Sequence, residues 1–292
     1  MIMLKFLKSK IKKIVKPTRG LGFPGDGKQR QRSAQIEALR ALKVNENFIN
    51  KFPELLFCNE SYFSLADKVD AAKVIEEYIQ STEQWMNYSD QVPSLAGWVD
   101  SRGHDFKNPH PAIKYIVEIF KEFQPATVLD IGAGAGVVSK YIFASMPETK
   151  ITCLEGSERH ILEMKENFNE SDIIPPKIKV QANIVKGIAQ RMPFVDRSFE
   201  FVFTCTVMMH NPFIPGVLAA CEIARVSSRY ILHVEGYHTD GVASFRTPEN
   251  LRVYDYERLY NLLGFQTKKK FFYQDPYAKD YDYIVFLAER IK

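Results

Sequence analysis

The pattern of hydrophobic and polar positions along the chain changes near Pro125. Before this proline, apolar residues recur at helical spacing, most clearly over residues 66–88, and predict a helical N-terminal region. After it, short apolar runs alternate with helical stretches. The apolar runs are ATVLDIG, KITCLEG, KIKVQAN, FEFVFTC and RYILHVEG, and the helical stretches include VVSKYIFASM, ERHILEMKENF and PGVLAACEIARV. This alternation predicts parallel strands joined by crossover helices.

The last two apolar runs, residues 265–274 and 282–290, are joined only by DPYAKDY, which is too short for a crossover helix. They therefore predict an antiparallel hairpin at the sheet edge. The expected fold class is α/β, a doubly wound Rossmann-like sheet that is mostly parallel, with an antiparallel C-terminal hairpin and a helical N-terminal extension. The expected parts are a basic amphipathic helix over 1–17, a linker and helical region over 18–109, and the α/β domain over 110–292.

Basic side chains gather at the N-terminus. Residues 1–19 contain seven lysines and arginines and no acid, whereas the remaining 273 residues carry 32 basic and 35 acidic side chains. The body of the protein is therefore not expected to bind nucleic acid. Apolar residues at helical spacing run along the other face of the first segment, at Leu4, Leu7, Ile11 and Ile14. Two interpretations stay open: docking on the anionic inner leaflet of a membrane, and a solvated N-terminus.

Composition narrows the class of protein further. A content of 46% hydrophobic and 25% charged residues is that of a globular chain. No apolar run approaches the ~18 residues of a transmembrane helix, and the interleaved lysines exclude a secretory signal. The four cysteines are far apart without a C-x-x-C pair, which predicts reduced, packed thiols and no metal site. We expect a cytoplasmic protein, with peripheral attachment to the inner face of the membrane as the alternative.

Two glycine-rich stretches invite a phosphate-binding interpretation. Residues 22–29, GFPGDGKQ, nearly match a phosphate loop, but Gln29 replaces the hydroxyl residue that holds magnesium and no strand precedes the stretch. The second stretch is VLDIGAGAG, residues 128–136, in which a strand ends in a glycine turn before a helix. Only this second stretch has the context of a ligand-binding turn above the carboxyl ends of parallel strands.

The turn at residues 132–136 favours S-adenosylmethionine over NAD. Gly132, Gly134 and Gly136, with Ala133 between them, let the backbone approach a ligand. The dinucleotide pattern G-x-G-x-x-G would require glycine at position 137, where this chain has Val137. Asp130 lies just before the turn, where a carboxylate repels a pyrophosphate but suits the cationic amino-acid end of a ligand.

The next strand, KITCLEG, ends in Glu155 and Gly156. An acid at this place can bind both ribose hydroxyls of an adenosine. A surface acid in a loop is the alternative, but the position of Glu155 at a strand end near the glycine turn favours the ligand-binding interpretation.

With these motifs the chain resembles the class I S-adenosylmethionine-dependent methyltransferases over about residues 110–290. AQRMPFVDRSFEFVFTC, residues 189–205, resembles the adenine-side loop and fourth strand of that family. The resemblance implies that Asp130 and the glycines surround the methionine part of the cofactor and that Glu155 binds the ribose. Ile188 stands where many members have an acid, which implies an apolar or backbone contact at the adenine. The complete expected cofactor-binding set is Asp130, Gly132, Ala133, Gly134, Gly136, Glu155, Gly156, Ile188, Ala189 and Thr204.

Candidate residues for the methyl acceptor are fewer. His210, in TVMMHNPF, follows the fourth strand and is the candidate base, since a histidine can accept the proton of an alcohol. A wall of the pocket is its other interpretation. Glu235, Tyr237 and His238 are expected on a loop after the fifth strand that faces the acceptor, whereas His233 is expected to be structural. His104 could reach the site from the N-terminal segment or serve in an ordinary turn.

The stretches MMHNPFIPGVLAACEIARVSSRYILHVEGYH and FFYQDPYAKDYDYIVFLAERIK are also similar to small methylases associated with pseudaminic acid and related bacterial surface sugars. This similarity implies O-methylation of a saccharide, a sugar nucleotide or a glycan in surface-glycan biosynthesis, or of another small polar metabolite. A protein acceptor stays open as an alternative. So does a catalytically inactive, membrane-peripheral scaffold that keeps the methyltransferase fold. A dehydrogenase ranks behind these because of Asp130 and Val137 at the glycine turn.

Overall fold

The computed structural model describes residues 109–170, 176–211, 213–237, 254–274 and 282–291. These residues all belong to the compact unit Thr82–Lys292. The predicted basic helix over 1–17 and nearly all of the region over 18–109 lie outside the described residues. His104 and His238, two of the acceptor candidates, also lie outside them.

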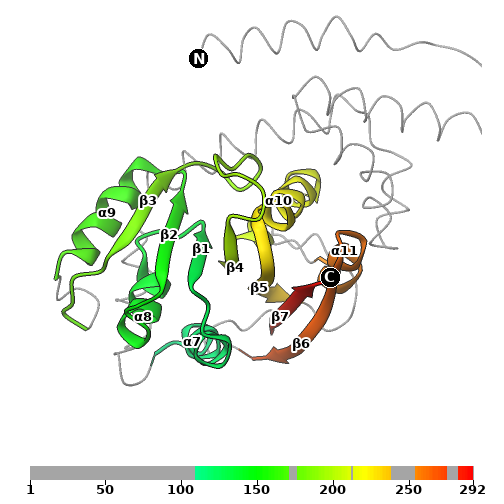
Figure 1. Ribbon diagram of the computed structural model, residues 1–292, viewed down its shortest axis with the longest axis horizontal. Helices are drawn as coiled ribbons and strands as arrows, with labels where there is room; N and C mark the ends of the chain where they lie inside the picture. The colour runs from blue at the N-terminus through cyan, green and yellow to red at the C-terminus, as the bar shows by residue number, and fades with distance from the viewer. Residues whose placement is uncertain (1–108, 171–175, 212, 238–253, 275–281, 292) are drawn as a thin grey trace, which may run out of the picture. The chain divides into compact units, whose positions relative to one another are not determined.

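A seven-stranded sheet forms the centre of the domain, in the order β3-β2-β1-β4-β5-β7-β6 (Figure 1). Five strands are parallel and the C-terminal pair is antiparallel, with β7 inserted between β5 and β6. This confirms the expected fold class. The strands are β1 (Thr127–Ile131), β2 (Lys150–Glu155), β3 (Ala182–Lys186), β4 (Phe199–Cys205), β5 (Ser227–Tyr237), β6 (Phe265–Tyr273) and β7 (Asp282–Arg290).

One face of the sheet is covered by three helices, α7 (Pro111–Phe123), α8 (Val137–Ser145) and α9 (Glu158–Phe168). Their apolar residues form one core with alternate strand residues such as Phe203 and Leu232. The Phe120 ring of α7, for example, lies 5.4 Å from the Phe203 ring. The α7 boundaries follow from local chemistry, since the His110 ring accepts the Ala112 N–H and Pro111 begins the helix.

The opposite face carries α10 (Phe213–Val226) and α11 (Tyr256–Leu262), preceded by the short 3-10 helix η2 (Met208–His210). His233 of β5 alternates with Leu232 and Val234 of the first core, so its ring points to this second face, where it stacks on Tyr256 and Tyr260 of α11. The two layers of helices therefore sandwich the sheet, as in other doubly wound folds.

The strand order reverses between β2 and β4, which flank β1 on either side. Parallel strands have their carboxyl ends at one edge, and ligands of doubly wound folds bind at that edge where the order reverses. The turns after β1, β2 and β4 meet there.

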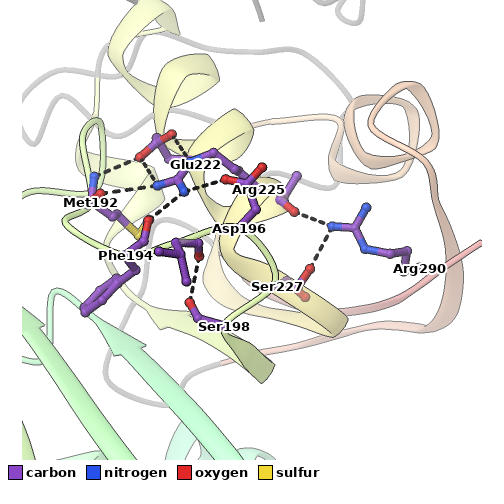
Figure 2. A network of polar contacts seen from close by, with 10 residues as sticks. Met192, Phe194, Asp196, Ser198, Glu222, Arg225, Ser227 and Arg290 are labelled. Carbon is purple, nitrogen blue, oxygen red and sulfur yellow. Dashed lines mark hydrogen bonds and ion pairs between the residues drawn. The ribbon is translucent and has the colours of Figure 1, made fainter. Parts of the chain in front are cut away.

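The connection from β3 to β4, residues 187–198, contains no helix, and the structure describes all of it. Figure 2 shows how α10 holds it instead, through the guanidinium of Arg225. This group donates to the carbonyls of Phe194 (2.7 Å) and Met192 (3.2 Å) and to the Asp196 carboxylate (2.9 Å). Glu222 pairs with the same guanidinium and accepts the Met192 N–H at 2.8 Å. Polar contacts thus do the anchoring that helix packing does elsewhere in the sheet.

Candidate functional site

The glycine turn after β1 is held in shape by its own hydrogen bonds. Gly132, Gly134 and Gly136 have left-handed backbone angles, with φ of 65°, 55° and 73°, which glycine adopts without strain. The N–H groups of Gly132 and Ala133 donate to the Leu154 carbonyl at 2.8 and 3.2 Å, and the Gly136 N–H donates to the Ala133 carbonyl at 2.8 Å. The turn is therefore fastened to the end of β2.

Two of the glycines are also required for space. A Cβ at Gly136 would lie 2.5 Å from the Phe168 ring of α9, and a Cβ at Gly132 would lie 2.7 Å from Val207 Cγ2. The turn thus packs directly against α9 and against the segment that follows β4. Neither glycine can be replaced without moving a neighbour.

Glu155, at the end of β2, binds the middle of this turn. Its Oε2 accepts the Gly134 N–H at 2.8 Å, and its Oε1 accepts the N–H groups of Gly156 (2.8 Å) and Ser157 (2.9 Å). Burial alone would raise the pKa of Glu155, but hydrogen bonds from His160, Ser157 and Gly134 outweigh burial and lower the pKa. The structure therefore brings Gly134 and Gly156 to the carboxylate of Glu155, which is charged at neutral pH.

Asp130 lies beneath the same turn. Its side chain is buried, and Oδ2 accepts the Ser139 hydroxyl of α8 at 2.7 Å. Burial raises the pKa of Asp130 to about 7, against the Ser139 hydrogen bond, and the neighbouring Glu155 charge adds to the rise. The carboxyl group expected at the methionine part of a ligand is thus buried and bonded to α8.

The expected adenine side lies beside Glu155. Ile188 Cγ2 lies 3.5 Å from the place where a Cβ of Gly156 would stand, so this apolar side chain borders the same turn. Ala189 follows and is buried. The connection that carries both residues is fixed by Arg225 (Figure 2). Ile188 thus offers an apolar surface next to a charged one.

Thr204 differs from the expectation of a cofactor contact. It is completely buried, and its hydroxyl donates to Glu235 Oε1 at 2.6 Å. Because the hydroxyl donates there, it accepts from Nδ1 of His233 (2.7 Å), whose Nε2 then accepts from the Tyr260 hydroxyl (2.7 Å). The side chain points into the second core because it shares the face of His233 in the sheet register.

Glu235 and Tyr237 are not on a loop, because β5 continues through Tyr237. Glu235 is completely buried and accepts three donors, the Thr204 hydroxyl and the backbone N–H groups of Val207 (3.1 Å) and Met209 (3.2 Å). The half-buried Tyr237 ring lies 4.8 Å from the Phe272 ring of β6. Glu235 therefore cannot touch an acceptor, which corrects the expectation from the sequence.

His210 is the last residue of η2 and is half-buried. Burial lowers its pKa to about 4, so the imidazole is neutral at physiological pH. The backbone N–H of His210 donates to the Val207 carbonyl at 3.2 Å, and Val207 in turn contacts Gly132. The candidate base thus belongs to a segment that contacts the glycine turn.

The sequence analysis missed Gln190 and Asn211. The Gln190 amide donates to Asn211 Oδ1 at 2.6 Å, and the Asn211 amide donates to the Val207 carbonyl at 2.8 Å. Tyr254 donates its hydroxyl to the Asn211 carbonyl at 2.8 Å. Asn211 therefore links the adenine side to the segment of His210. Its place before Pro212 is a turn signal in the sequence, but its partner Gln190 has no such signal.

Within the described ranges, no group of three or more His, Cys, Asp or Glu side chains has an arrangement that could hold a metal ion. In the same part of the chain, none of the helices combines the length and the apolar character that crossing a membrane requires.

Comparison with known proteins shows which proteins this chain is similar to. Residues 128–227 match the family model described as a methyltransferase domain. The demethylmenaquinone methyltransferase of Thermotoga maritima is 32% identical over 89 residues, a match that covers 30% of this chain and 34% of that protein. The chain thus matches only about a third of the length of this curated relative.

Two solved structures share the fold. The magnesium protoporphyrin IX methyltransferase of Synechocystis PCC 6803, with bound S-adenosylmethionine, has a TM-score of 0.53 at 13% identity and covers 73% of this chain and 96% of its own. The 1,6-didemethyltoxoflavin-N1-methyltransferase of Burkholderia thailandensis, with bound S-adenosylhomocysteine, has a TM-score of 0.51 at 13% identity and covers 74% and 90%. Together with the domain match, these findings support the predicted methyltransferase domain and its S-adenosylmethionine cofactor.

The residues at the edge of the sheet where the strand order reverses fit that cofactor chemically. A carboxylate offers about four lone-pair positions to donors, and three backbone N–H groups occupy Glu155. Two of these donors and the His160 ring lie at Oε1, whereas Oε2 accepts the Gly134 N–H alone among the described residues, so the position that stays available for a ribose hydroxyl is at Oε2. Ile188 supplies an apolar neighbour for an adenine, and the negative charge of Glu155 favours a cationic ligand.

Proposed function

We propose that this protein is an S-adenosylmethionine-dependent methyltransferase that methylates a hydroxyl group of a small polar acceptor, in the first place a saccharide or sugar nucleotide of surface-glycan biosynthesis. One observation carries the cofactor part: a charged Glu155 binds the amide of Gly134 in the middle of the glycine turn. This turn lies within the segment that matches a methyltransferase domain.

The same observation argues against a dinucleotide. A pyrophosphate needs backbone N–H groups that point at it. Here the N–H groups of Gly132, Ala133, Gly134 and Gly136 all donate to acceptors of the protein. One of those acceptors is the Glu155 carboxylate, which would repel a phosphate. A ligand with ribose hydroxyls and no phosphate is the better match.

When bound, the cofactor would supply a methyl group on a sulfonium: the acceptor oxygen would bond to the methyl carbon in line as the carbon–sulfur bond breaks, and the neutral thioether would leave. The protein's task is to align the acceptor oxygen and to take up its proton. His210 is the candidate for the second task, since burial keeps its imidazole neutral and able to accept a proton. Its lowered pKa makes it a weak base, so it would assist proton transfer late in the displacement rather than ionise the hydroxyl beforehand.

The acceptor class rests on this chain's own sequence. The names of the relatives span a demethylated menaquinone, a porphyrin and a toxoflavin precursor, so they point to no common acceptor. The similarity to surface-sugar methylases in residues 208–238 and 271–292 supports a saccharide hydroxyl. The basic amphipathic segment over 1–17 suits work on carrier-bound glycans at the inner leaflet of a membrane.

The test is transfer of a labelled methyl group from S-adenosylmethionine to a panel of sugar nucleotides, with demethylmenaquinone and unmodified protein extracts as the competing acceptors. Label on a sugar hydroxyl supports the proposal. Label on the quinone or on protein alone would overturn the acceptor class, and no transfer to any acceptor would favour the inactive scaffold.

The role of His210 is tested with His210→Ala and the acceptor found in that panel. If His210 is the general base, the variant should turn over at least about tenfold more slowly, because general base catalysis contributes about two orders of magnitude or more. Its affinity for the cofactor should be nearly unchanged. Normal turnover at every pH would assign His210 to the pocket wall.

A further inference from the structure

The turn after β4, residues 206–211, contacts three parts of the candidate site and is called the hub turn below. Val207 packs against Gly132 of the glycine turn. Asn211 accepts the Gln190 amide from the adenine-side connection. His210, the candidate base, belongs to the hub turn itself. A shift of this turn would therefore move the cofactor side and the acceptor side of the site at once.

Glu235 of β5 holds the hub turn from the buried side. Its Oε1 accepts the Val207 N–H at 3.1 Å and its Oε2 accepts the Met209 N–H at 3.2 Å, so each oxygen fixes one peptide of the turn. The next residue of β5, Gly236, donates its N–H to the Met209 sulfur at 3.2 Å. Two successive residues of one rigid strand thus anchor the hub turn.

The chemistry of this contact is specific to a carboxylate. The donors that converge on Glu235 are the N–H groups of Val207 and Met209 and the hydroxyl of Thr204, so the group between them must accept at both oxygens. Both oxygens of a carboxyl group carry acceptor lone pairs, whereas an amide would turn one end into a donor that faces an N–H. A buried N–H without an acceptor costs about 1–3 kcal/mol, which the hub turn would relieve by moving.

We propose that Glu235 is a positioning residue for methyl transfer: by holding the N–H groups of Val207 and Met209, it keeps Val207 against the glycine turn and His210 beside the reacting groups. This inference rests on the proposed function. It assigns a role to an acid that touches neither cofactor nor acceptor.

The test uses the full-length protein and the variant Glu235→Gln, which keeps the size of the side chain. The first readout is amide hydrogen exchange at Val207 and Met209. The second is the calorimetric affinity for S-adenosylhomocysteine. We expect exchange at one or both amides to accelerate at least about tenfold, and the affinity to fall several-fold.

Tyr260→Phe is the matched control. It removes a hydroxyl from the same buried network, where Tyr260 bonds His233. Among the described residues, no hydrogen bond joins Tyr260 to the hub turn. A merely structural role of Glu235 predicts that both variants lose stability and that both keep the affinity of the unchanged protein. A positioning role predicts that only Glu235→Gln weakens binding.

A second variant tests the same link from its other end and stays informative if Glu235→Gln does not fold. Val207→Ala shortens the side chain that contacts Gly132 and leaves Glu235 intact. If Glu235 acts through Val207, the two substitutions together weaken binding less than the sum of their separate effects. Full additivity, or unchanged affinity in Glu235→Gln, would overturn the proposal.

The two proposals fail in different ways. If the unchanged protein does not bind S-adenosylhomocysteine, the proposed function fails. Exchange at Val207 and Met209 then still decides whether Glu235 holds the hub turn, and unaltered exchange in Glu235→Gln would remove the anchor itself.

Discussion

Three buried carboxyl groups lie near the edge of the sheet where the strand order reverses, and their pKa values are shifted in different directions. Glu155 keeps some contact with solvent and lies 3.8 Å from His160, and hydrogen bonds lower its pKa. Asp130 and Glu235 are more deeply buried, and burial raises the pKa of each to about 7 despite their hydrogen bonds. Where burial excludes water, the cost of desolvating the charge outweighs the hydrogen bonds that the carboxylate accepts. The depth of burial therefore decides in which direction each pKa is shifted.

Glu155→Gln tests the charged carboxylate at the residue scale. The change removes a charge-assisted acceptor worth about 1.5–3 kcal/mol, so the affinity for S-adenosylhomocysteine should fall about tenfold to a hundredfold in calorimetry. Glu158→Gln is the control, because that side chain is 70% exposed and pairs only with Lys186 among the described residues. Equal affinity in both variants would contradict the role of Glu155.

Asp130→Asn tests the neighbouring carboxyl through pH. The folded state holds the Asp130 proton up to about pH 7, whereas the unfolded chain releases it near its ordinary pKa of 3.8. The folded state therefore binds more protons in this window, and stability falls as pH rises through 7. From pH 6 to pH 8 the unfolding free energy of the unchanged protein should therefore fall by about 1 kcal/mol more than that of Asp130→Asn. Denaturant unfolding at both pH values measures it, and parallel pH dependences would contradict it.

The place of a single residue in the fold could be predicted from the sequence where it depends only on the end of a strand. Glu155 follows an apolar run and faces the glycine turn because parallel strands place their carboxyl ends at one edge. Thr204 and Glu235 were misplaced because their roles depend on which face of the sheet they share. That face follows from a register between β4 and β5 that no local pattern reveals.

At the scale of elements, the connection from β3 to β4 depends on one side chain. Arg225 and Glu222 are only 14% and 15% exposed and satisfy four groups of residues 192–196 (Figure 2). Arg225→Met would remove the partner of three of these groups, the carbonyls of Met192 and Phe194 and the Asp196 carboxylate, and would leave Glu222 without its guanidinium. We expect a loss of about 2–3 kcal/mol of unfolding free energy. Proteolysis should also cleave residues 187–198 faster than in the unchanged protein.

The control for that experiment is Arg229→Met. Arg229 is 54% exposed and pairs with Glu289 and Glu200 at the surface. Exposed pairs of this kind contribute less than about 1 kcal/mol. Similar losses in both variants would show that Arg225 is no special anchor.

The glycine turn offers a second test at this scale. Gly136→Ala places a Cβ against the Phe168 ring in a left-handed residue, so strain and collision together should cost about 2–4 kcal/mol of unfolding free energy. Gly264→Ala is the matched control, with φ of 85° and nothing within 4 Å of its Cβ. It should cost only about 1 kcal/mol. Equal losses in denaturant unfolding would argue against the close packing of the turn on α9.

Elements themselves were largely predictable, because periods of two and 3.6 residues survive in single sequences. The parallel strands and the C-terminal hairpin occur along the chain in the predicted sequence. The third strand was placed too early, because β3 lies at Ala182–Lys186 and overlaps only the end of the apolar run KIKVQAN. The end of β5 was placed too early, since HVEGY contains a glycine that reads as a turn but lies inside the strand. The contacts of Arg225 could not be predicted, because they join residues about 30 positions apart.

For the whole molecule, the strand order is what gives these residues a common site. The reversal beside β1 brings the ends of β1, β2 and β4 together, and with them Gly134, Glu155 and the hub turn. The fold alone carries many chemistries. The combination of a charged acid with a glycine turn whose amides already have acceptors is what selects an adenosyl ligand without phosphates.

The most direct measurement is a calorimetric titration of the full-length protein with S-adenosylhomocysteine, and with NAD as the competing ligand. We expect one-site binding of S-adenosylhomocysteine and no binding of NAD. Binding of NAD, or no binding of S-adenosylhomocysteine, would contradict it.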